Sequence, residues 1–292
     1  MKLPFKAAGA AAVAATVLAL AACGGSGEAS SAPAASESAD SGYNLVSDGT
    51  ISLATTGNSE PFSYTSADGK LTGFDVELFR ELASRLDLKT EIKTYDFDTI
   101  LPLIATHQID VAMNSIADTD ERRQTVDFTL PDYTGTMNLV VPKTSAIKDE
   151  KGIEGKRVGV IAASMGAKYA EEFYPKAQLV TFPDSGAVMT AVQSGQLDAA
   201  FIDGQEATKY EKQYPVHSVV ATTDPDNRGA AIVVSKDDPE LRKALNQELR
   251  DVVEDGTYKK LFTKYAPNEP VEPQLEFLTK YYGDHPSNDY PN

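Results

Sequence analysis

The sequence has 292 residues, with 43 acidic against 27 basic side chains, a formal net charge of −16, one cysteine and no tryptophan. This length suffices for about two domains with cores of their own, and the acidic balance argues against nucleic acid binding, because a polyanion repels phosphate. One cysteine excludes an intramolecular disulfide and a thiolate zinc cluster, and the three histidines lack metal-ligand spacing, so we expect no metal and no cofactor.

The first segment of the chain has the layout of a secretory signal. Lysines precede an apolar stretch over residues 7–22, which is shorter than a membrane span of about 20 residues. The stretch ends in Leu-Ala-Ala-Cys at residues 20–23, which is similar to the lipobox of bacterial lipoproteins. We therefore expect residues 1–22 to be a signal peptide and Cys23 to carry a lipid that anchors the protein on the extracytoplasmic face of a bacterial cell membrane. A buried or incidental cysteine is the alternative interpretation.

The next segment is rich in Gly, Ser, Ala, Glu and Pro from residue 24 to about residue 42. Such a composition cannot bury enough apolar surface to offset its chain entropy. The sequence therefore predicts a lipidated, flexible tether over residues 23–48.

From Thr50 onward, short β-rich runs alternate with amphipathic helical stretches. Strands are expected at Ile51–Thr55, Glu91–Thr94, Asp110–Met113, Asn138–Val141, Arg157–Ile161, Leu179–Phe182, Ala199–Ile202, Ser218–Ala221 and Ala230–Val234. Helices are expected at Phe74–Leu86, Thr99–Ala105, Ser185–Gln193, Pro239–Asp255 and Tyr258–Tyr265. This alternation is typical of an α/β fold with parallel sheets covered on both faces, which bind ligands beyond the carboxyl ends of their strands.

Two polar, glycine-containing segments interrupt the alternation, at residues 142–156 and 222–229. Each separates one series of strands and helices from the next. Two interruptions within one alternating body indicate two lobes joined by more than one crossing strand.

Short motifs along the body carry a resemblance to a known family. They lie at 60–64, 69–78, 96–98, 101–102, 109–111, 119–123, 126–128, 155–160, 195–199 and 255–258. In this order and spacing, over roughly residues 48–268, the chain resembles the bacterial extracellular solute-binding proteins of family 3, which capture polar amino acids for ABC importers.

The resemblance implies a two-lobed, periplasmic-binding-protein-like α/β fold of type II, whose lobes are joined by two crossing strands and close like a hinge. Lobe 1 would combine residues 49–138 with 229–272, and lobe 2 would comprise 139–228. Residues 273–292 form a C-terminal extension without an assigned role, and its tyrosines either dock on lobe 1 or are disordered.

The resemblance also implies a site for a zwitterion. Arg122 would bind the α-carboxylate, because a guanidinium presents two donors to a planar carboxylate, and Ser164 would add a hydroxyl and helix N-terminal amides. Asp203 would bind the α-ammonium with carbonyls near Ser115, and Phe97 would pack over the ligand side chain. Taken alone, these residues have plainer interpretations: a solvated arginine, a helix cap, an Asp-Gly turn and a core aromatic residue.

The remaining expected pocket residues are Thr56, Ala117 and Met165. The chain departs from the family pattern here, since the frequent aspartate near Thr56 is absent and alanine replaces a hydroxyl residue at 117. Ser59 also stands where an aromatic residue is usual, which widens the pocket. Glu60 and Asp118 are unusual acids near the site, which either read a polar or cationic ligand group or are simply solvated.

Three functions are compatible with these residues. The first is a monomeric binding protein, not an enzyme, that delivers a polar amino acid such as cystine, glutamine or a related zwitterion to ABC transporter permease subunits. The second is an enzyme similar to cyclohexadienyl dehydratase, with Glu60 or Asp118 as general acid. The third is an adhesin or antigen with a vestigial pocket, against which the intact Arg122 and Asp203 argue.

Overall fold

The computed structural model describes residues 42–222, 228–267 and 269–291. The expected signal peptide, the cysteine at position 23 and most of the expected tether lie outside these residues. These described residues all belong to one compact unit. None of the helices within the described ranges is long and apolar enough to cross a membrane.

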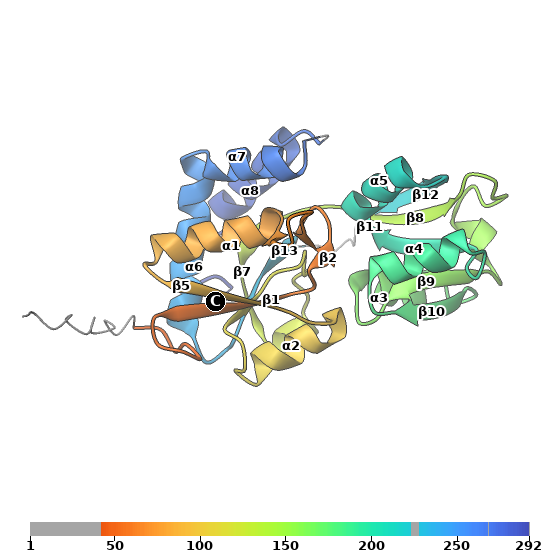
Figure 1. Cartoon of the computed structure of the whole chain (residues 1–292). Coiled ribbons are helices and arrows are strands. Elements are labelled where there is room, and N and C mark those ends of the chain that lie inside the picture. The colour runs from red at the N-terminus through yellow and green to blue at the C-terminus, as the bar shows by residue number, and fades with distance from the viewer. Residues whose placement is uncertain (1–41, 223–227, 268, 292) are drawn as a thin grey trace, which may run out of the picture. The chain divides into compact units, whose positions relative to one another are not determined.

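The first of two five-stranded sheets has the order β5-β1-β6-β13-β7 (Figure 1). Its strands are β1 (Thr50–Thr55), β5 (Lys89–Thr94), β6 (Val111–Ala112), β7 (Asp127–Tyr133) and β13 (Ala230–Val234). Strand β1 runs parallel to β5 and β6, whereas β13 runs antiparallel to β6 and β7.

The second five-stranded sheet has the order β10-β9-β11-β8-β12. Its strands are β8 (Met137–Pro142), β9 (Arg157–Ile161), β10 (Gln178–Phe182), β11 (Ala199–Asp203) and β12 (Val216–Thr222). Strands β10, β9 and β11 are parallel, and β8 runs antiparallel to β11 and β12.

The prediction of parallel sheets is therefore wrong in part, because both sheets are mixed. The antiparallel neighbours include β8 and β13, the strands by which the chain enters one sheet from the other. Such a strand arrives without the helical crossover that a parallel partner needs, so it is free to run the opposite way. A small third sheet of β2 (Asn58–Ser59), β3 (Ser63–Thr65) and β4 (Leu71–Thr72) was not predicted.

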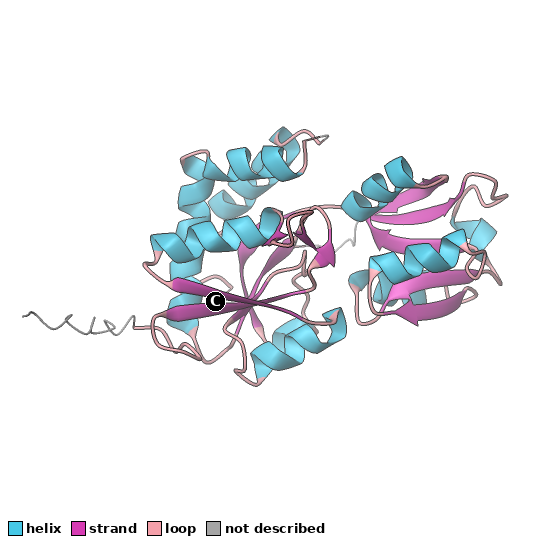
Figure 2. Cartoon of the chain, in the orientation of Figure 1, coloured by secondary structure: helices cyan, strands magenta, loops and turns pink. Residues whose placement is uncertain are grey.

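The helices cover both faces of the two larger sheets (Figure 2). They are α1 (Phe74–Arg85), α2 (Phe97–Ala105), α3 (Met165–Phe173), α4 (Ser185–Gln193), α5 (Gly204–Gln213), α6 (Pro239–Glu254), α7 (Thr257–Tyr265) and α8 (Glu272–Asp284), with 3-10 turns η1 (Arg122–Gln124) and η2 (Glu150–Ile153). Helix α6 has a clear start signal: the Asp238 side chain accepts from the Leu241 amide, and Pro239 follows at the first turn.

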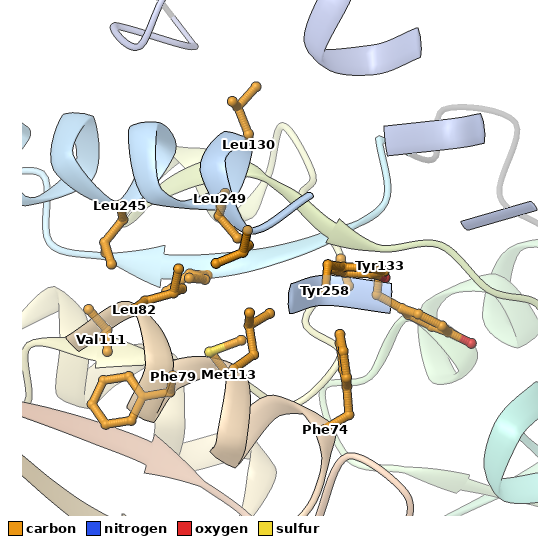
Figure 3. Close-up of a cluster of buried hydrophobic side chains, with 14 of the residues drawn as sticks. Phe74, Phe79, Leu82, Val111, Met113, Leu130, Tyr133, Leu245, Leu249 and Tyr258 are labelled. Carbon is orange, nitrogen blue, oxygen red and sulfur yellow. The ribbon is translucent and has the colours of Figure 1, made fainter. Parts of the chain in front are cut away.

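The largest hydrophobic cluster lies on one face of the first sheet, between α1 and α6 (Figure 3). Phe74 and Leu82 of α1 and Leu245 and Leu249 of α6 are each at most 1% exposed. Helix α2 covers the opposite face. Burial of a Leu or Phe side chain is worth about 1.5–3 kcal/mol, so this layer holds the strand ends in fixed positions.

The chain crosses between the two sheets twice, at residues 134–136 and between the end of β12 at Thr222 and the start of β13 at Ala230. In the second crossing only Arg228 and Gly229 are described. Strand β8 begins at Met137, before the lobe boundary expected at residue 139. Lobe 1 is accordingly the part of the chain built on the first sheet, and lobe 2 is the part built on the second.

Both ends of the described chain pack on lobe 1. Tyr43, which the expected tether includes, packs against the large hydrophobic cluster. In the C-terminal extension, Tyr282 is buried and its hydroxyl donates to the Pro131 carbonyl at 2.7 Å. Gln274 bonds both the amide and the carbonyl of Thr134 in the first crossing, at 3.0 and 2.6 Å. The extension is therefore docked, and α8 holds the crossing segment.

Candidate functional site

A cavity of about 480 Å³ lies between the lobes. All eight residues that the sequence singled out for a ligand line it: Thr56, Phe97, Ser115, Ala117, Arg122, Ser164, Met165 and Asp203. The volume is in the range of small-molecule sites. The structure thus brings these residues together, and their contact with a ligand stays a prediction.

Arg122 is a buried cation at the lobe 1 wall of the cavity. Its side chain donates to the Ala117 carbonyl at 2.8 Å and to the Ala163 carbonyl of lobe 2 at 3.0 Å, and it lies 5.9 Å from the Phe97 ring centre. No carboxylate within the described residues forms an ion pair with it. Burial lowers the pKa of Arg122 to about 10, so the guanidinium is desolvated and lacks an anion.

Ser164 caps helix α3 on the lobe 2 side. Its hydroxyl accepts a hydrogen bond from the Ala167 amide at 3.0 Å. The plain interpretation of this serine as a cap is correct, and it places the positive end of the helix dipole at the cavity beside Met165. Ala163 just before it has a φ of 58°, and its carbonyl is the one that Arg122 reaches.

Asp203 ends β11 and caps α5. Its carboxyl accepts from the Gln205 amide at 2.9 Å, so the interpretation of Asp203-Gly204 as a turn is wrong and the pair begins a helix. Burial, then the charge of Glu206, raises the pKa of Asp203 to about 8. A carboxyl with this desolvation gains most from a cation placed against it.

A buried network fixes the lobe 1 floor of the cavity. The amide of Ser115, whose φ is 50°, donates to Asp75 at 3.1 Å. Burial raises the pKa of Asp75 to about 7. Asn114 accepts from the Thr56 hydroxyl at 2.7 Å, which sets the direction of that hydroxyl. The sequence alone did not single out Asp75 or Asn114 for the site.

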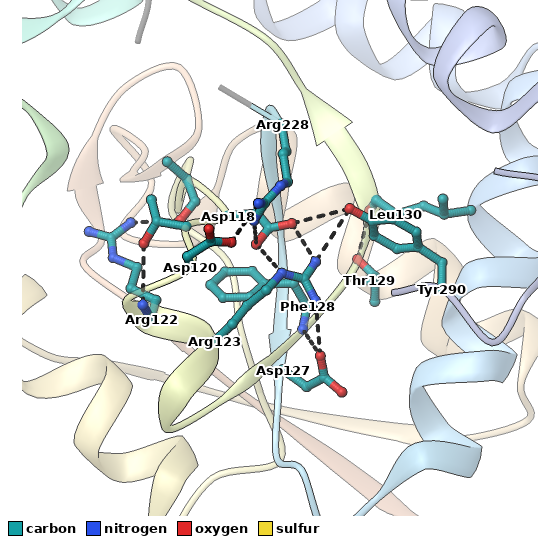
Figure 4. Close-up of polar contacts among 12 residues, drawn as sticks. Asp118, Asp120, Arg122, Arg123, Asp127, Phe128, Thr129, Leu130, Arg228 and Tyr290 are labelled. Atoms are coloured by element: carbon teal, nitrogen blue, oxygen red, sulfur yellow. Dashed lines mark hydrogen bonds and ion pairs between the residues drawn. The ribbon is translucent and has the colours of Figure 1, made fainter. Parts of the chain in front are cut away.

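Asp118 is not solvated, contrary to one expectation for it (Figure 4). It is 3% exposed and forms two hydrogen bonds with Arg123, one of them at 2.5 Å. Arg228 lies 3.7 Å from the same carboxylate, and Tyr290 donates to it at 3.4 Å. Arg123 is itself held by a second acid, since it also pairs with Asp127 at 3.3 Å.

The other unusual acid, Glu60, is half-exposed and pairs with Lys209 of lobe 2 at 3.1 Å. Further contacts join the lobes around the cavity. Ser59 donates to Glu206, and Lys168 pairs with Glu121. These contacts make the described arrangement a closed one.

Glu206 also lines the cavity, although the sequence did not single it out for a ligand. It lies in the first turn of α5 and is 4% exposed. One carboxyl oxygen, Oε1, accepts from Ser59 at 2.5 Å and from Ser185 at 2.9 Å. Burial raises the pKa of Glu206. No helix was predicted to begin at Gly204. Such a prediction would have placed Glu206 about one helical turn after Asp203, on the same face of the helix.

No group of three or more His, Cys, Asp or Glu side chains within the described ranges could hold a metal ion.

The family model of the bacterial extracellular solute-binding proteins, family 3, matches residues 51–268. The Escherichia coli K12 histidine-binding periplasmic protein is 30% identical over 225 residues, which cover 74% of this chain and 86% of that protein. The Bacillus subtilis relative, a probable amino-acid-binding protein, is 32% identical over 77% of this chain and 86% of its own length.

Solved structures agree with these relatives. An ancestral arginine-binding protein bound to arginine is 31% identical, with a TM-score of 0.70, and the match covers 74% of this chain and 98% of that one. An ancestral amino-acid-binding protein, described as a precursor of cyclohexadienyl dehydratase, is 32% identical, with a TM-score of 0.68 over 74% of this chain and 95% of that one.

Proposed function

The chain belongs to the bacterial extracellular solute-binding proteins of family 3, and we propose that it captures a free α-amino acid in the cavity between its lobes and delivers it to an ABC importer. One observation carries the choice of ligand. A buried arginine without a carboxylate partner among the described residues, Arg122, lines the same cavity as Asp203, a partly buried acid with a raised pKa. The relatives named above bind amino acids.

In this proposal the ligand supplies an anionic partner for Arg122 and a cationic partner for Asp203. Its α-carboxylate takes both donors of Arg122 and the positive end of α3 at Ser164. Its α-ammonium lies against Asp203 and the backbone carbonyls around Ser115. Phe97, whose ring already faces the guanidinium, covers the ligand, and closure of the lobes removes water and strengthens each charged contact.

A thermal-shift screen tests the ligand class. The purified chain is heated with each of the twenty amino acids, cystine, ornithine and small dicarboxylates. A ligand at 100 times its Kd stabilises the folded state by about 2.7 kcal/mol, which raises the melting temperature. We expect a shift with at least one α-amino acid and none with its decarboxylated or N-acetylated form. Equal shifts with those derivatives would contradict the proposal.

The dehydratase alternative has one observation in its favour, the raised pKa of Asp203, which suits a general acid. Desolvation of a carboxyl that binds the ligand ammonium accounts for the same raised pKa. Incubation of the chain with a cyclic dienyl acid, followed by absorbance of an aromatic product, separates the two. We expect no turnover above that of an Asp203→Asn variant.

For the membrane attachment, we propose that Cys23 carries the lipid and that residues 24–42 tether a monomeric receptor to the extracytoplasmic face of the membrane. Its support is the Leu-Ala-Ala-Cys pattern after an apolar stretch. A Cys23→Ser variant is expected in the culture medium instead of the membrane fraction. Retention of that variant in the membrane would overturn the anchor.

A further inference from the structure

Recognition of an α-carboxylate and an α-ammonium leaves one buried acid of the cavity without a role. Glu206 lies in the first turn of α5, which Asp203 caps, so the two carboxyls are about one helical turn apart. Both line the cavity. A single α-ammonium satisfies one of them, and the other then faces the remainder of the ligand.

The contacts of Glu206 leave one of its oxygens available. Both hydroxyl donors, from Ser59 and Ser185, bond to Oε1. For Oε2, no hydrogen bond is found within the described part of the chain. Lys209, the cation whose charge acts on this carboxyl, is itself paired with Glu60 at 3.1 Å. A carboxylate oxygen accepts about two hydrogen bonds, and its burial is costly until it has a partner.

The ion pairs among the side chains that line the cavity also leave Glu206 without a cationic partner. Among the other lining acids, Asp118, Asp120 and Glu121 are ion-paired with arginine or lysine side chains, Asp184 caps α4 through the Ala187 amide, and Glu172 is exposed. Within the described residues, the lining cation without an ion pair is Arg122, whereas the partly buried Asp203 and the buried Glu206 form no ion pair. A ligand with one carboxylate and two cationic groups complements these three side chains.

We propose that Glu206 is a specificity-determining residue whose Oε2 binds a second cationic group of the ligand, so that the chain prefers α-amino acids of net charge +1 to neutral zwitterions. This assignment rests on the proposed function, since it presupposes that Arg122 and Asp203 hold the α-carboxylate and α-ammonium. Ser59 and Ser185 orient the carboxylate by donating to its other oxygen. The positive end of α5 keeps it ionised once the ligand cation is present.

Isothermal titration calorimetry with matched ligands tests this assignment. Arginine is compared with citrulline, and lysine with norleucine, because each second member has nearly the same shape without the side-chain charge. We expect the chain to bind the charged member of at least one pair about tenfold or more tightly than its neutral partner, which corresponds to about 1.4 kcal/mol. Neutral partners that bind as tightly as the charged ones would overturn the assignment.

The Glu206→Gln variant keeps the shape and removes the charge. Its affinity for the charged ligand is expected to fall about tenfold or more, while its affinity for citrulline or norleucine changes less than about threefold. The matched control is Glu154→Gln on lobe 2, an acid whose side chain is 59% exposed and outside the cavity, which should change neither affinity. An equal loss for charged and neutral ligands would mean that Glu206 only joins the lobes, and would overturn the assignment.

The two proposals fail in different ways. If no α-amino acid binds at all, the proposed function is wrong. If neutral α-amino acids bind as tightly as charged ones, the function holds and the role of Glu206 is wrong. The comparison of ligands on the unmodified chain is valid even if the Glu206→Gln variant does not fold.

Discussion

Asp118 and Glu206 are two buried acids on opposite walls of one cavity, with opposite surroundings. Asp118 is held by Arg123, with Arg228 and Tyr290 beside it. Glu206 has two serine hydroxyls on one oxygen and no ion pair within the described ranges. The difference shows that nearness to a site does not make an acid available to a ligand. The acid whose charge the protein leaves unpaired is the one that can select a ligand.

Removal of the Asp118 carboxylate should have the largest effect on stability. In Asp118→Ala, the Arg123 guanidinium loses its buried partner, and we expect the free energy of unfolding to fall by about 3–5 kcal/mol. Asp120→Asn is the control, because Asp120 shares Arg228 but is 84% exposed, and it should cost less than about 1 kcal/mol. Chemical denaturation measures both. A loss below about 1 kcal/mol in Asp118→Ala would show that the pair is not structural.

The affinity for the ligand should depend on pH through the Asp203 carboxyl. Because the pKa of Asp203 is about 8 without ligand, its carboxyl is mostly protonated at pH 6, and the ammonium must lower that pKa to bind. Affinity should therefore rise by about fiftyfold from about pH 6 to about pH 8, as the ionised fraction of Asp203 rises from about 1% to about 50%, with release of a proton. Calorimetry in buffers of different ionisation enthalpy measures the proton. A constant affinity with no proton release would contradict this account of Asp203.

The C-terminal tail should make a smaller contribution to the free energy of unfolding, through the contact of Tyr290 with Asp118. The Tyr290 hydroxyl bonds Tyr281 at 2.6 Å and lies 3.4 Å from both Asp118 and Arg123. Tyr290→Phe removes these three bonds, and we expect a loss of about 1 kcal/mol in unfolding free energy. Tyr214→Phe is the control, since its hydroxyl has no hydrogen bond among the described residues. Equal stability of the two variants would show that the tail contact is incidental.

Glu206→Gln should have the smallest effect on stability, within about 1 kcal/mol of the unmodified chain. The amide oxygen still accepts from Ser59 and Ser185, and the change removes a charge whose burial is unfavourable. Thermal unfolding without ligand measures this. A destabilisation as large as that of Asp118→Ala would mean that both acids stabilise the fold, and that the contrast between Asp118 and Glu206 is wrong.

The sequence predicted most of the elements, and two of those it missed have contrary local signals. Strand β7 contains Pro131, which is unusual in a strand, and it is tolerated because β7 lies at the edge of its sheet. Helix α5 begins with Asp203-Gly204, a pair that more often forms a turn. The buried positions of α8, Gln274, Leu278 and Tyr282, follow helical spacing and could have revealed it.

The candidate site was predictable to a similar extent. Motif positions gave the eight expected residues, which all line the cavity. Arg123, the main partner of Asp118, is near it in sequence, but Arg228, Tyr290 and the Glu60 partner Lys209 come from distant segments. Local sequence carries no signal for such pairing, so the question of which acid is free required the three-dimensional structure.

Calorimetric titration of Arg122→Ala is the most direct test of the central claim that a ligand carboxylate fills the gap beside this arginine. Arg157→Ala is the control, because Arg157 lies outside the cavity in a half-exposed pair with Asp198. We expect Arg122→Ala to fold and to lose about 2–5 kcal/mol of binding free energy for the amino acid found in the screen, while Arg157→Ala binds normally. Undiminished affinity in a folded Arg122→Ala variant would contradict the account.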